Sequence, residues 1–126
     1  MEHITLQEYK QLQQKGNSKY GAKKVIINGI KFDSQKEGNH YLELKLLEKQ
    51  GLIKDLRIQV RFELQPKYKK NNKTIRAINY IADFVYFDKA KKKMIIEDTK
   101  GFRTEVYKLK KKIFEYVYPD LEIKEV

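Results

Sequence analysis

The segments Tyr80-Ile81-Ala82-Asp83-Phe84 and Ile95-Ile96-Glu97-Asp98-Thr99-Lys100-Gly101 are the part of this sequence from which its fold is best inferred. Their β-branched and aromatic residues predict two strands. Because strand side chains alternate between faces, Asp98 and Lys100 should share one face while Glu97 points the other way. If the two strands pair, Asp83 and Asp98 lie together beside the Lys100 ammonium group.

Charged side chains in such apolar strands are costly unless they pair with one another or hold a cation. Two carboxylates can bind a hard divalent cation, and a lysine beside them can orient or activate a water molecule. A solvated strand edge or an ordinary salt bridge is the alternative explanation for an aspartate two residues before a lysine. The apolar residues before both acids, the glycine after the lysine and the basic segment that follows favour a site.

The composition indicates one small domain that binds a polyanion. The chain has 126 residues, and 28 Lys and Arg against 17 Asp and Glu give a net charge of +11. A nucleic acid is a better candidate partner than a membrane surface, because no amphipathic terminal helix carries Trp or Phe; a lysine-rich genome would also contribute to the excess. The lack of cysteine excludes disulfides and fits a reducing cytoplasm. No apolar run reaches the length of a membrane span and no secretory signal is visible, so we expect a cytoplasmic protein.

Apolar periodicity and turn signals predict an N-terminal arm or short helix at residues 1–18 and a single domain at 19–126. Asn28-Gly29 is typical of a hairpin turn, and Ser34 with Glu37 three residues later has the form of a capping box. The expected elements are a hairpin at 25–32, a helix that opens at 33–37 and stops at Gly51, strands at 57–64, 76–87 and 93–100, a basic turn at 67–73, a helix at 104–118 and a strand at 121–126.

The helix expected at 104–118 has an apolar stripe that we assign to the core: Val106, Leu109, Ile113 and Val117. Lysines occupy the other side, with Lys110 at the margin: Lys108, Lys111 and Lys112. A strand that follows a helix should return parallel to a strand already in the sheet. The expected fold is therefore α/β, with a helix, a three-stranded meander, a helix and a last strand forming a mixed central sheet flanked by helices, preceded by a hairpin.

This layout resembles that of the PD-(D/E)XK nucleases, in which an aspartate in one apolar strand is followed by (D/E)-x-K in the next. The runs I-A-D-F-V, E-D-T-K-G and Y-P-D-L-E-I-K look most like phage Holliday junction resolvases of the endonuclease I type. The runs K-Y-G-A-K-K and F-D-S-Q-K-E are similar to those of a phage family of small endonucleases. The resemblance covers about Lys19 to Val126 and implies a restriction-endonuclease-like αβββαβ core. Ala82 stands where the superfamily name has proline, and Asp98 where glutamate is commoner.

The resemblance implies a catalytic set of Glu37, Asp83, Asp98 and Lys100. Asp83 and Asp98 would bind Mg²⁺ or Mn²⁺ together with the carbonyl of Thr99, and Glu37 would reach the same metal site from its helix. Lys100 would contact the scissile phosphate or the attacking water. A capping role is the alternative for Glu37, and Glu97 is the reserve candidate for the position of Asp98.

Groups of basic residues would supply DNA phosphate contacts beside these acids: Lys69, Lys70, Lys73, Arg103, Lys108, Lys110, Lys111 and Lys112. The expected function is that of a metal-dependent endonuclease, a phage resolvase of branched DNA that acts as a homodimer in the host cytoplasm, because both strands must be cut symmetrically. A nicking or flap nuclease, or the endonuclease subunit of a transposition or packaging machine, would use the same chemistry. A non-catalytic DNA-binding module with structural acids is the alternative of another class.

Overall fold

The computed structural model describes residues 24–99 and 103–126. The chain forms two compact units, Met1–Leu46 and Leu47–Val126, and each is described by itself. The arm expected at residues 1–18 lies outside the described residues, and so do Lys100 and Gly101. Within the described ranges, no helix has the length and apolar character that crossing a membrane would require.

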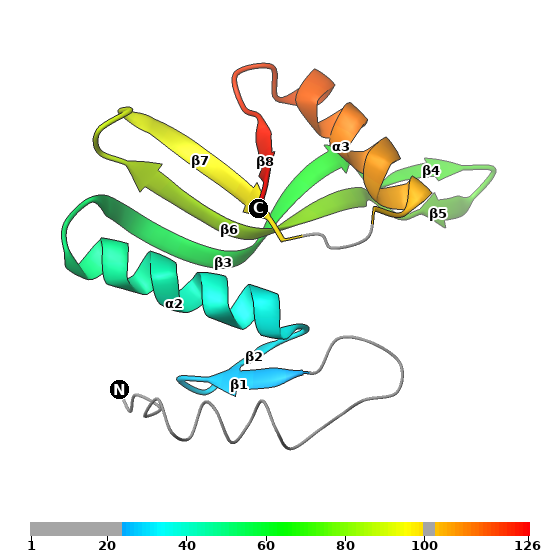
Figure 1. The fold of residues 1–126 in the computed structure, drawn as a ribbon. Helices are drawn as coiled ribbons and strands as arrows, with labels where there is room; N and C mark the ends of the chain where they lie inside the picture. Colours follow the sequence, from blue (N-terminus) through cyan, green and yellow to red (C-terminus); the bar gives the residue numbers. More distant parts are fainter. Residues whose placement is uncertain (1–23, 100–102) are drawn as a thin grey trace. The chain divides into compact units, whose positions relative to one another are not determined.

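The described part of the first unit is a hairpin followed by the start of a helix (Figure 1). Strands β1 (Val25–Ile27) and β2 (Ile30–Phe32) pair antiparallel. Asn28 and Gly29 between them have φ values of 53° and 77°, the left-handed conformation that a tight hairpin turn requires. The hairpin expected from the Asn-Gly pair is therefore confirmed.

Helix α2 (Gln35–Lys49) begins at the predicted cap, since the Ser34 hydroxyl accepts a hydrogen bond from the Glu37 N–H at 3.1 Å. Gly38 lies against the hairpin, where a Cβ atom would stand 2.9 Å from Cδ1 of Ile27. A side chain at this position would force the helix and the hairpin apart, so the sequence needs glycine here. The predicted stop is also present, because Gly51 follows the helix with φ 80°.

The second unit is built on a mixed four-stranded sheet in the order β3-β6-β7-β8. The strands are β3 (Ile53–Gln65), β6 (Ile78–Asp88), β7 (Lys93–Asp98) and β8 (Ile123–Glu125). The first three form the predicted antiparallel meander, and β8 returns parallel to β7 as expected for a strand that follows a helix. Strand β7 ends at Asp98, so Thr99 stands beyond the strand rather than inside it.

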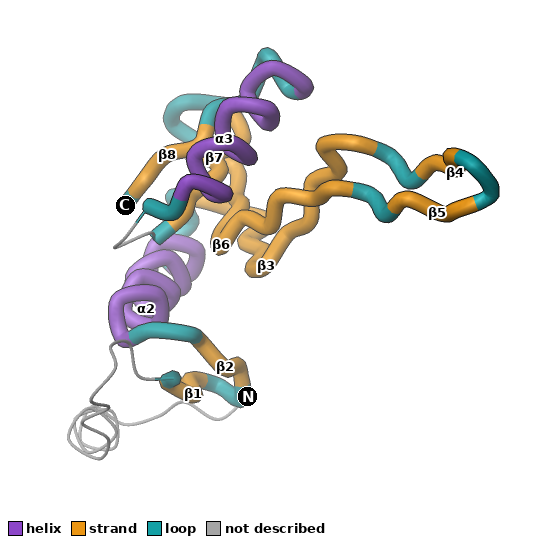
Figure 2. The backbone as a smooth tube through the Cα atoms, turned by 90° about the vertical axis from the view of Figure 1, so that its right-hand side faces the viewer, coloured by secondary structure: helices purple, strands orange, loops and turns teal. Residues whose placement is uncertain are grey.

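The basic turn predicted at 67–73 is confirmed only at Asn71-Asn72, because the residues around it form the strands of a second hairpin. Strands β4 (Tyr68–Lys70) and β5 (Lys73–Ile75) pair antiparallel, and Figure 2 shows them reaching outward from the ends of β3 and β6. Asn71 and Asn72 form the turn with φ values of 51° and 63°. Asparagine tolerates this left-handed conformation, so the Asn-Asn pair was the signal for a hairpin in the sequence.

The buried face of helix α3 (Glu105–Val117) also differs from the prediction. The helix begins as expected at Thr104, whose side chain accepts from the Tyr107 N–H. The predicted stripe is largely exposed, however, with Val106 and Leu109 at 62% and 59% exposure. Tyr107 and Phe114 are buried instead, since they bring more apolar area to the sheet than the smaller aliphatic side chains.

The core of the second unit is an aromatic cluster between α3 and the sheet. The Phe114 side chain is fully buried, and its ring centroid lies 5.1 Å from Phe62, 5.4 Å from Tyr80 and 5.1 Å from Tyr118. The Tyr118 hydroxyl donates to the carbonyl of Glu63 at 2.8 Å. These contacts fix α3 over β3 and β6, and β6 is the strand that carries Asp83.

Candidate active site at the ends of strands β6 and β7

The structure brings Asp83, Asp98 and Thr99 together. Strands β6 and β7 pair Phe84 with Glu97, and this register carries the next residues, Asp83 and Asp98, alongside each other. Oδ2 of Asp83 accepts from the N–H of Thr99 at 2.9 Å and from its hydroxyl at 2.8 Å. Asp83 is half-buried and Asp98 is fully buried, so Asp83 is the carboxylate that solvent reaches.

Tyr80 orients Asp98, a contact that the sequence did not suggest. The Tyr80 hydroxyl donates to Oδ2 of Asp98 at 2.6 Å inside the core. Burial and then this hydrogen bond raise the pKa of Tyr80, and the charge of Asp83 acts in the same direction. The hydroxyl therefore stays protonated and remains a donor across the neutral range, which holds the carboxylate of Asp98 in one orientation.

Gln59 reaches Asp83 from β3, the strand on the other side of β6. Its Nε2 donates to Oδ1 of Asp83 in a long hydrogen bond of 3.4 Å. Gln59 has φ 51°, a left-handed conformation in the middle of a strand that costs a non-glycine residue about 1–3 kcal/mol. Strained backbone of this kind clusters at functional sites, so Gln59 joins the candidate site.

Glu97 has different surroundings from Asp98, as the alternation of strand side chains predicted. It is buried, accepts from the Tyr86 hydroxyl at 2.7 Å and lies 3.8 Å from Nζ of Lys124. Burial and then this hydrogen bond raise the pKa of Tyr86. The expectation that Glu97 points away from Asp98 fits these contacts, and Asp98 remains the candidate metal ligand.

Glu125 is a further acid at this end of the sheet, because the parallel register places it beside Asp98. It accepts from the Tyr107 hydroxyl at 2.9 Å and pairs with Arg103 at 3.0 Å and Lys111 at 3.6 Å. The Tyr107 hydrogen bond, followed by the charges of Lys111 and Arg103, holds the pKa of Glu125 below its ordinary value of 4.5. Two of the predicted DNA-binding cations are thus anchored next to the candidate site.

The remaining predicted DNA contacts lie on exposed surfaces of the second unit. Lys108 is paired with Glu105 at 3.2 Å on α3, and Lys112 is exposed on the same helix. Lys110 is half-buried, which agrees with its marginal position on the helix. Lys69, Lys70 and Lys73 are exposed on the β4–β5 hairpin.

Asp83 and Asp98 fit a hard cation by the chemistry of their oxygen ligands. Over residues 24–99 and 103–126 there is no group of three or more His, Cys, Asp or Glu side chains that could hold a metal ion. Magnesium commonly takes only one or two carboxylates and completes its coordination with water and substrate phosphates, so a pair is a sufficient protein contribution. Glu37 is buried in the first turn of α2, in the other unit, and Lys100 lies outside the described residues.

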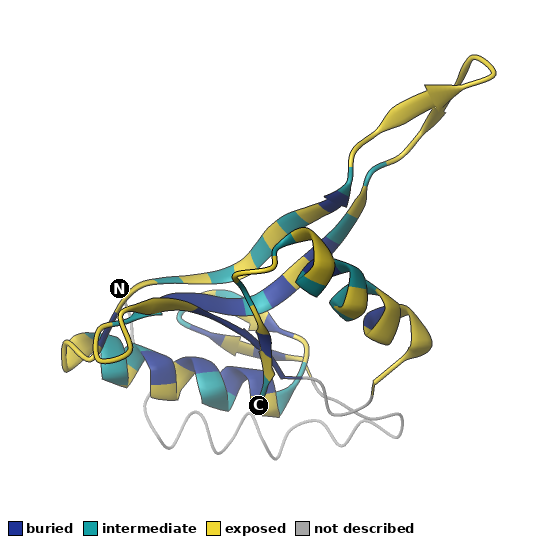
Figure 3. Ribbon diagram, turned by 90° about the horizontal axis from the view of Figure 1, so that it is seen from above, coloured by how far each residue is buried: buried dark blue, intermediate teal, exposed yellow. Residues whose placement is uncertain are grey.

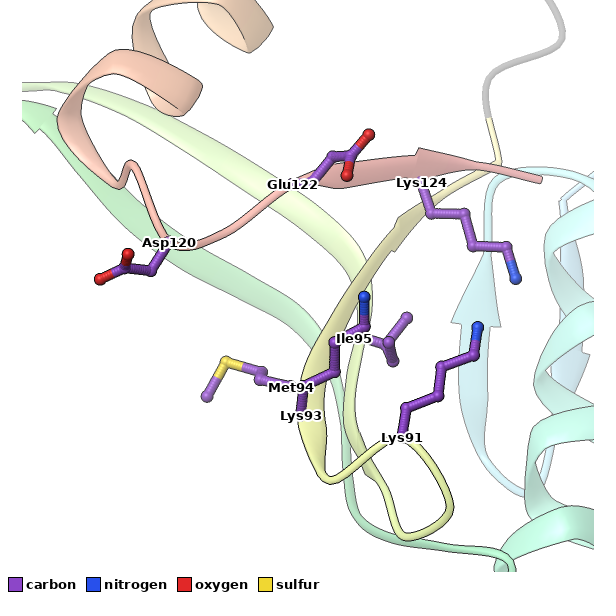
Figure 4. Close-up of a pocket in the computed structure, with 7 residues that line it drawn as sticks. All are labelled: Lys91, Lys93, Met94, Ile95, Asp120, Glu122 and Lys124. Carbon is purple, nitrogen blue, oxygen red and sulfur yellow. The ribbon is translucent and has the colours of Figure 1, made fainter.

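A pocket of about 240 Å³ lies elsewhere, along β7 and β8, and does not include the aspartate pair. Its lining residues, shown in Figure 4, are Lys91, Lys93, Met94, Ile95, Asp120, Glu122 and Lys124. The acidic side chains on its rim offset much of the lysine charge. Lys124 also pairs with Glu97, so this pocket is a weaker candidate for chemistry than the aspartate pair.

No curated protein and no solved structure matches this chain. A family model described as a protein of unknown function (DUF1064) matches residues 17–126. The match covers both strands of the candidate site, helix α3 and the hairpin before α2. The chain therefore belongs to the DUF1064 family.

Proposed function

We propose that this protein is a metal-dependent endonuclease of PD-(D/E)XK type that hydrolyses phosphodiester bonds in branched DNA. The observation that carries the proposal is the pair of aspartates on neighbouring strands, with Asp98 fully buried and oriented by Tyr80, and with Asp83 held by Thr99 and Gln59. Buried carboxylates gathered in this way are costly to a protein that has no use for them.

In the proposed reaction, Asp83 and Asp98 would hold a Mg²⁺ or Mn²⁺ ion, which would supply positive charge for the scissile phosphate and lower the pKa of a coordinated water. Tyr80 donates to Oδ2 of Asp98 and would keep this carboxylate in one orientation for binding the ion. Thr99 and Gln59 would orient Asp83 by donating to its two oxygens, Thr99 to Oδ2 and Gln59 to Oδ1. Lys100, two residues after Asp98, would stabilise the charge that builds on the phosphate.

The order of elements from α2 onward supports the assignment. Apart from the β4–β5 hairpin, this order is a helix, the three-stranded meander, α3 and a parallel last strand, which is the αβββαβ arrangement expected for such nucleases. Arg103 and Lys111 pair with Glu125 beside Asp98, so two cations lie next to the acids that must approach a polyanion. A homodimer would place two such sites on the two strands of a junction.

The test is a cleavage assay on a four-way junction, a flap and a linear duplex of matched length, each with Mg²⁺ and with EDTA. The proposal expects cleavage that requires the metal and is fastest on the junction. Cleavage of the flap alone would show that the protein is a flap nuclease and not a junction resolvase. DNA binding without cleavage of any substrate in Mg²⁺ or Mn²⁺ would instead support a non-catalytic module.

Tyr80→Phe is expected to slow junction cleavage about 10- to 100-fold and to raise the Mg²⁺ concentration needed for half-maximal rate. The reason is that Asp98 loses the donor that orients it while the aromatic ring stays in the core. The measurement is single-turnover cleavage across a Mg²⁺ titration.

Tyr86→Phe is the matched control, because it removes the equivalent buried hydrogen bond to Glu97. Both variants should lose a similar amount of stability, about 1–3 kcal/mol, since each leaves a buried carboxylate with one fewer donor. Only Tyr80→Phe should change the metal requirement. If the two variants changed the rate and the Mg²⁺ dependence equally, Tyr80 would have only a structural role.

A further inference from the structure

The β4–β5 hairpin is an exposed two-stranded ribbon that extends the sheet beyond its packed region. The pairing of β3 with β6 ends at Gln65 and Ile78, and the ribbon continues past it with Tyr68 opposite Ile75. All the strand residues of the ribbon are exposed, and Figure 3 shows it exposed along its length while the neighbouring parts of β3 and β6 carry buried positions. Folding of the core does not require this ribbon, because it buries little apolar surface.

The ribbon carries charge of one sign only. Between Pro66 and Ala77 the sequence has no Asp or Glu and five basic residues, all exposed: Lys67, Lys69, Lys70, Lys73 and Arg76. Lys70 stands directly opposite Lys73 in the register. Like charges in opposed strand positions are destabilising, and a two-stranded ribbon has little packing to offset this. A polyanionic partner would turn the repulsion into attraction.

The shape of the ribbon identifies the kind of polyanion. The major groove of duplex DNA admits an α-helix or a two-stranded β-ribbon. In the observed register Tyr68 and Ile75 share one face with Lys70 and Lys73, whereas Lys69 lies on the opposite face. Both faces of the ribbon thus present cations, which suits contact with the phosphates on both sides of a groove. The apolar side chains of Tyr68 and Ile75 can pack against sugars and bases.

We propose that the β4–β5 ribbon is a DNA-binding arm that lies in a groove of a duplex next to the cleavage site and holds it through phosphate contacts, without reading the base sequence. The proposal deepens the proposed nuclease function by assigning the surface that grips the substrate. Its binding step does not depend on the metal or on Asp83 and Asp98, so it can be measured separately from cleavage.

The decisive variant is the full-length chain with Lys69→Ala, Lys70→Ala and Lys73→Ala combined. Its matched control removes the same charge from the exposed β6–β7 loop region with Lys89→Ala, Lys91→Ala and Lys93→Ala. Binding to a linear duplex is measured by fluorescence anisotropy in EDTA, where no cleavage occurs, between 50 and 200 mM salt, roughly the range over which phosphate contacts change affinity most visibly. Two duplexes of unrelated sequence are used.

The ribbon variant should bind at least about tenfold more weakly at the low-salt end, and the slope of log K against log salt should fall by about 2–3, close to one per lost phosphate contact. Both duplexes should be affected alike, and the control should lose much less. Equal losses in the two variants would overturn the proposal, because net charge alone would then explain binding. A loss on only one duplex would also overturn it, since the ribbon would then read sequence.

Two further readouts keep this test separate from that of the nuclease. The melting temperature of the ribbon variant should be unchanged or higher, because the substitutions are exposed and remove like-charge repulsion. If the wild type binds DNA through the ribbon but cleaves no substrate, the DNA-binding role of the ribbon is supported and the proposed nuclease activity is contradicted. If the ribbon variant keeps its DNA affinity but loses binding to vesicles rich in phosphatidylserine, the partner is a membrane and the DNA proposal is overturned.

Discussion

Replacing Asp83 or Asp98 by asparagine is expected to abolish cleavage of a four-way junction while DNA binding stays intact. Asparagine keeps the size of the side chain and one oxygen that can accept from Thr99 or Tyr80. It removes the negative charge that a hard cation requires, so the rate should fall at least about a hundredfold. Cleavage is measured under single-turnover conditions in Mg²⁺, and DNA binding is measured by fluorescence anisotropy in EDTA.

Glu97→Gln is the control for Asp98→Asn, because the two residues are neighbours on β7 and both are buried acids with a tyrosine donor. The control should keep substantial cleavage, since Glu97 lies with Tyr86 and Lys124 and not with Asp83. An inactive Glu97→Gln together with an active Asp98→Asn would exchange the roles of the two acids and overturn the site. Unchanged cleavage in EDTA would overturn the metal requirement itself.

Phe114→Ala is expected to destabilise the protein by about 3–5 kcal/mol, the usual result of removing a buried aromatic side chain. Phe114 is fully buried and its ring contacts Phe62, Tyr80 and Tyr118, so a cavity would open at the centre of the cluster. This loss is a large share of the stability of a small domain. Urea denaturation followed by circular dichroism measures it.

Leu109→Ala on the same helix provides the comparison. Leu109 is 59% exposed, and alanine is the best helix former, so the free energy of unfolding should change by no more than about 0.5 kcal/mol. If the aliphatic stripe predicted from the sequence were the buried face, Leu109→Ala would reduce the free energy of unfolding more than Phe114→Ala. A larger loss for Leu109→Ala than for Phe114→Ala would show that the buried face of α3 is the one expected from periodicity.

Local signals account for the parts of the fold that were predicted correctly. Asn28-Gly29 specifies its turn through two left-handed residues, and Ser34 caps α2 through one hydrogen bond to Glu37. The meander and the parallel last strand followed from strand alternation and from the connection rule for a strand after a helix.

Some features of the proposed site were likewise predictable from local sequence, and others were not. Strand alternation separated Asp98 from Glu97, because side-chain parity is a property of the strand itself. The contacts of Tyr80 with Asp98 and of Gln59 with Asp83 could not be predicted, since they join residues distant in sequence. The left-handed backbone of Gln59 likewise has no local signal in its residue type.

By itself the sequence determined the order of the longer helices and strands, the Asn28-Gly29 turn and the Ser34 cap, because these depend on residues close together in the chain. The register that sets Asp83 alongside Asp98 comes from the pairing of β6 with β7. Only the tertiary structure decided which face of α3 is buried. The helix has two candidate apolar faces, and the aromatic one packs against Phe62 and Tyr80 and buries more area. The Asn71-Asn72 turn has a local signal, but the projection of the β4–β5 ribbon past the end of the β3–β6 pairing is a property of the tertiary structure.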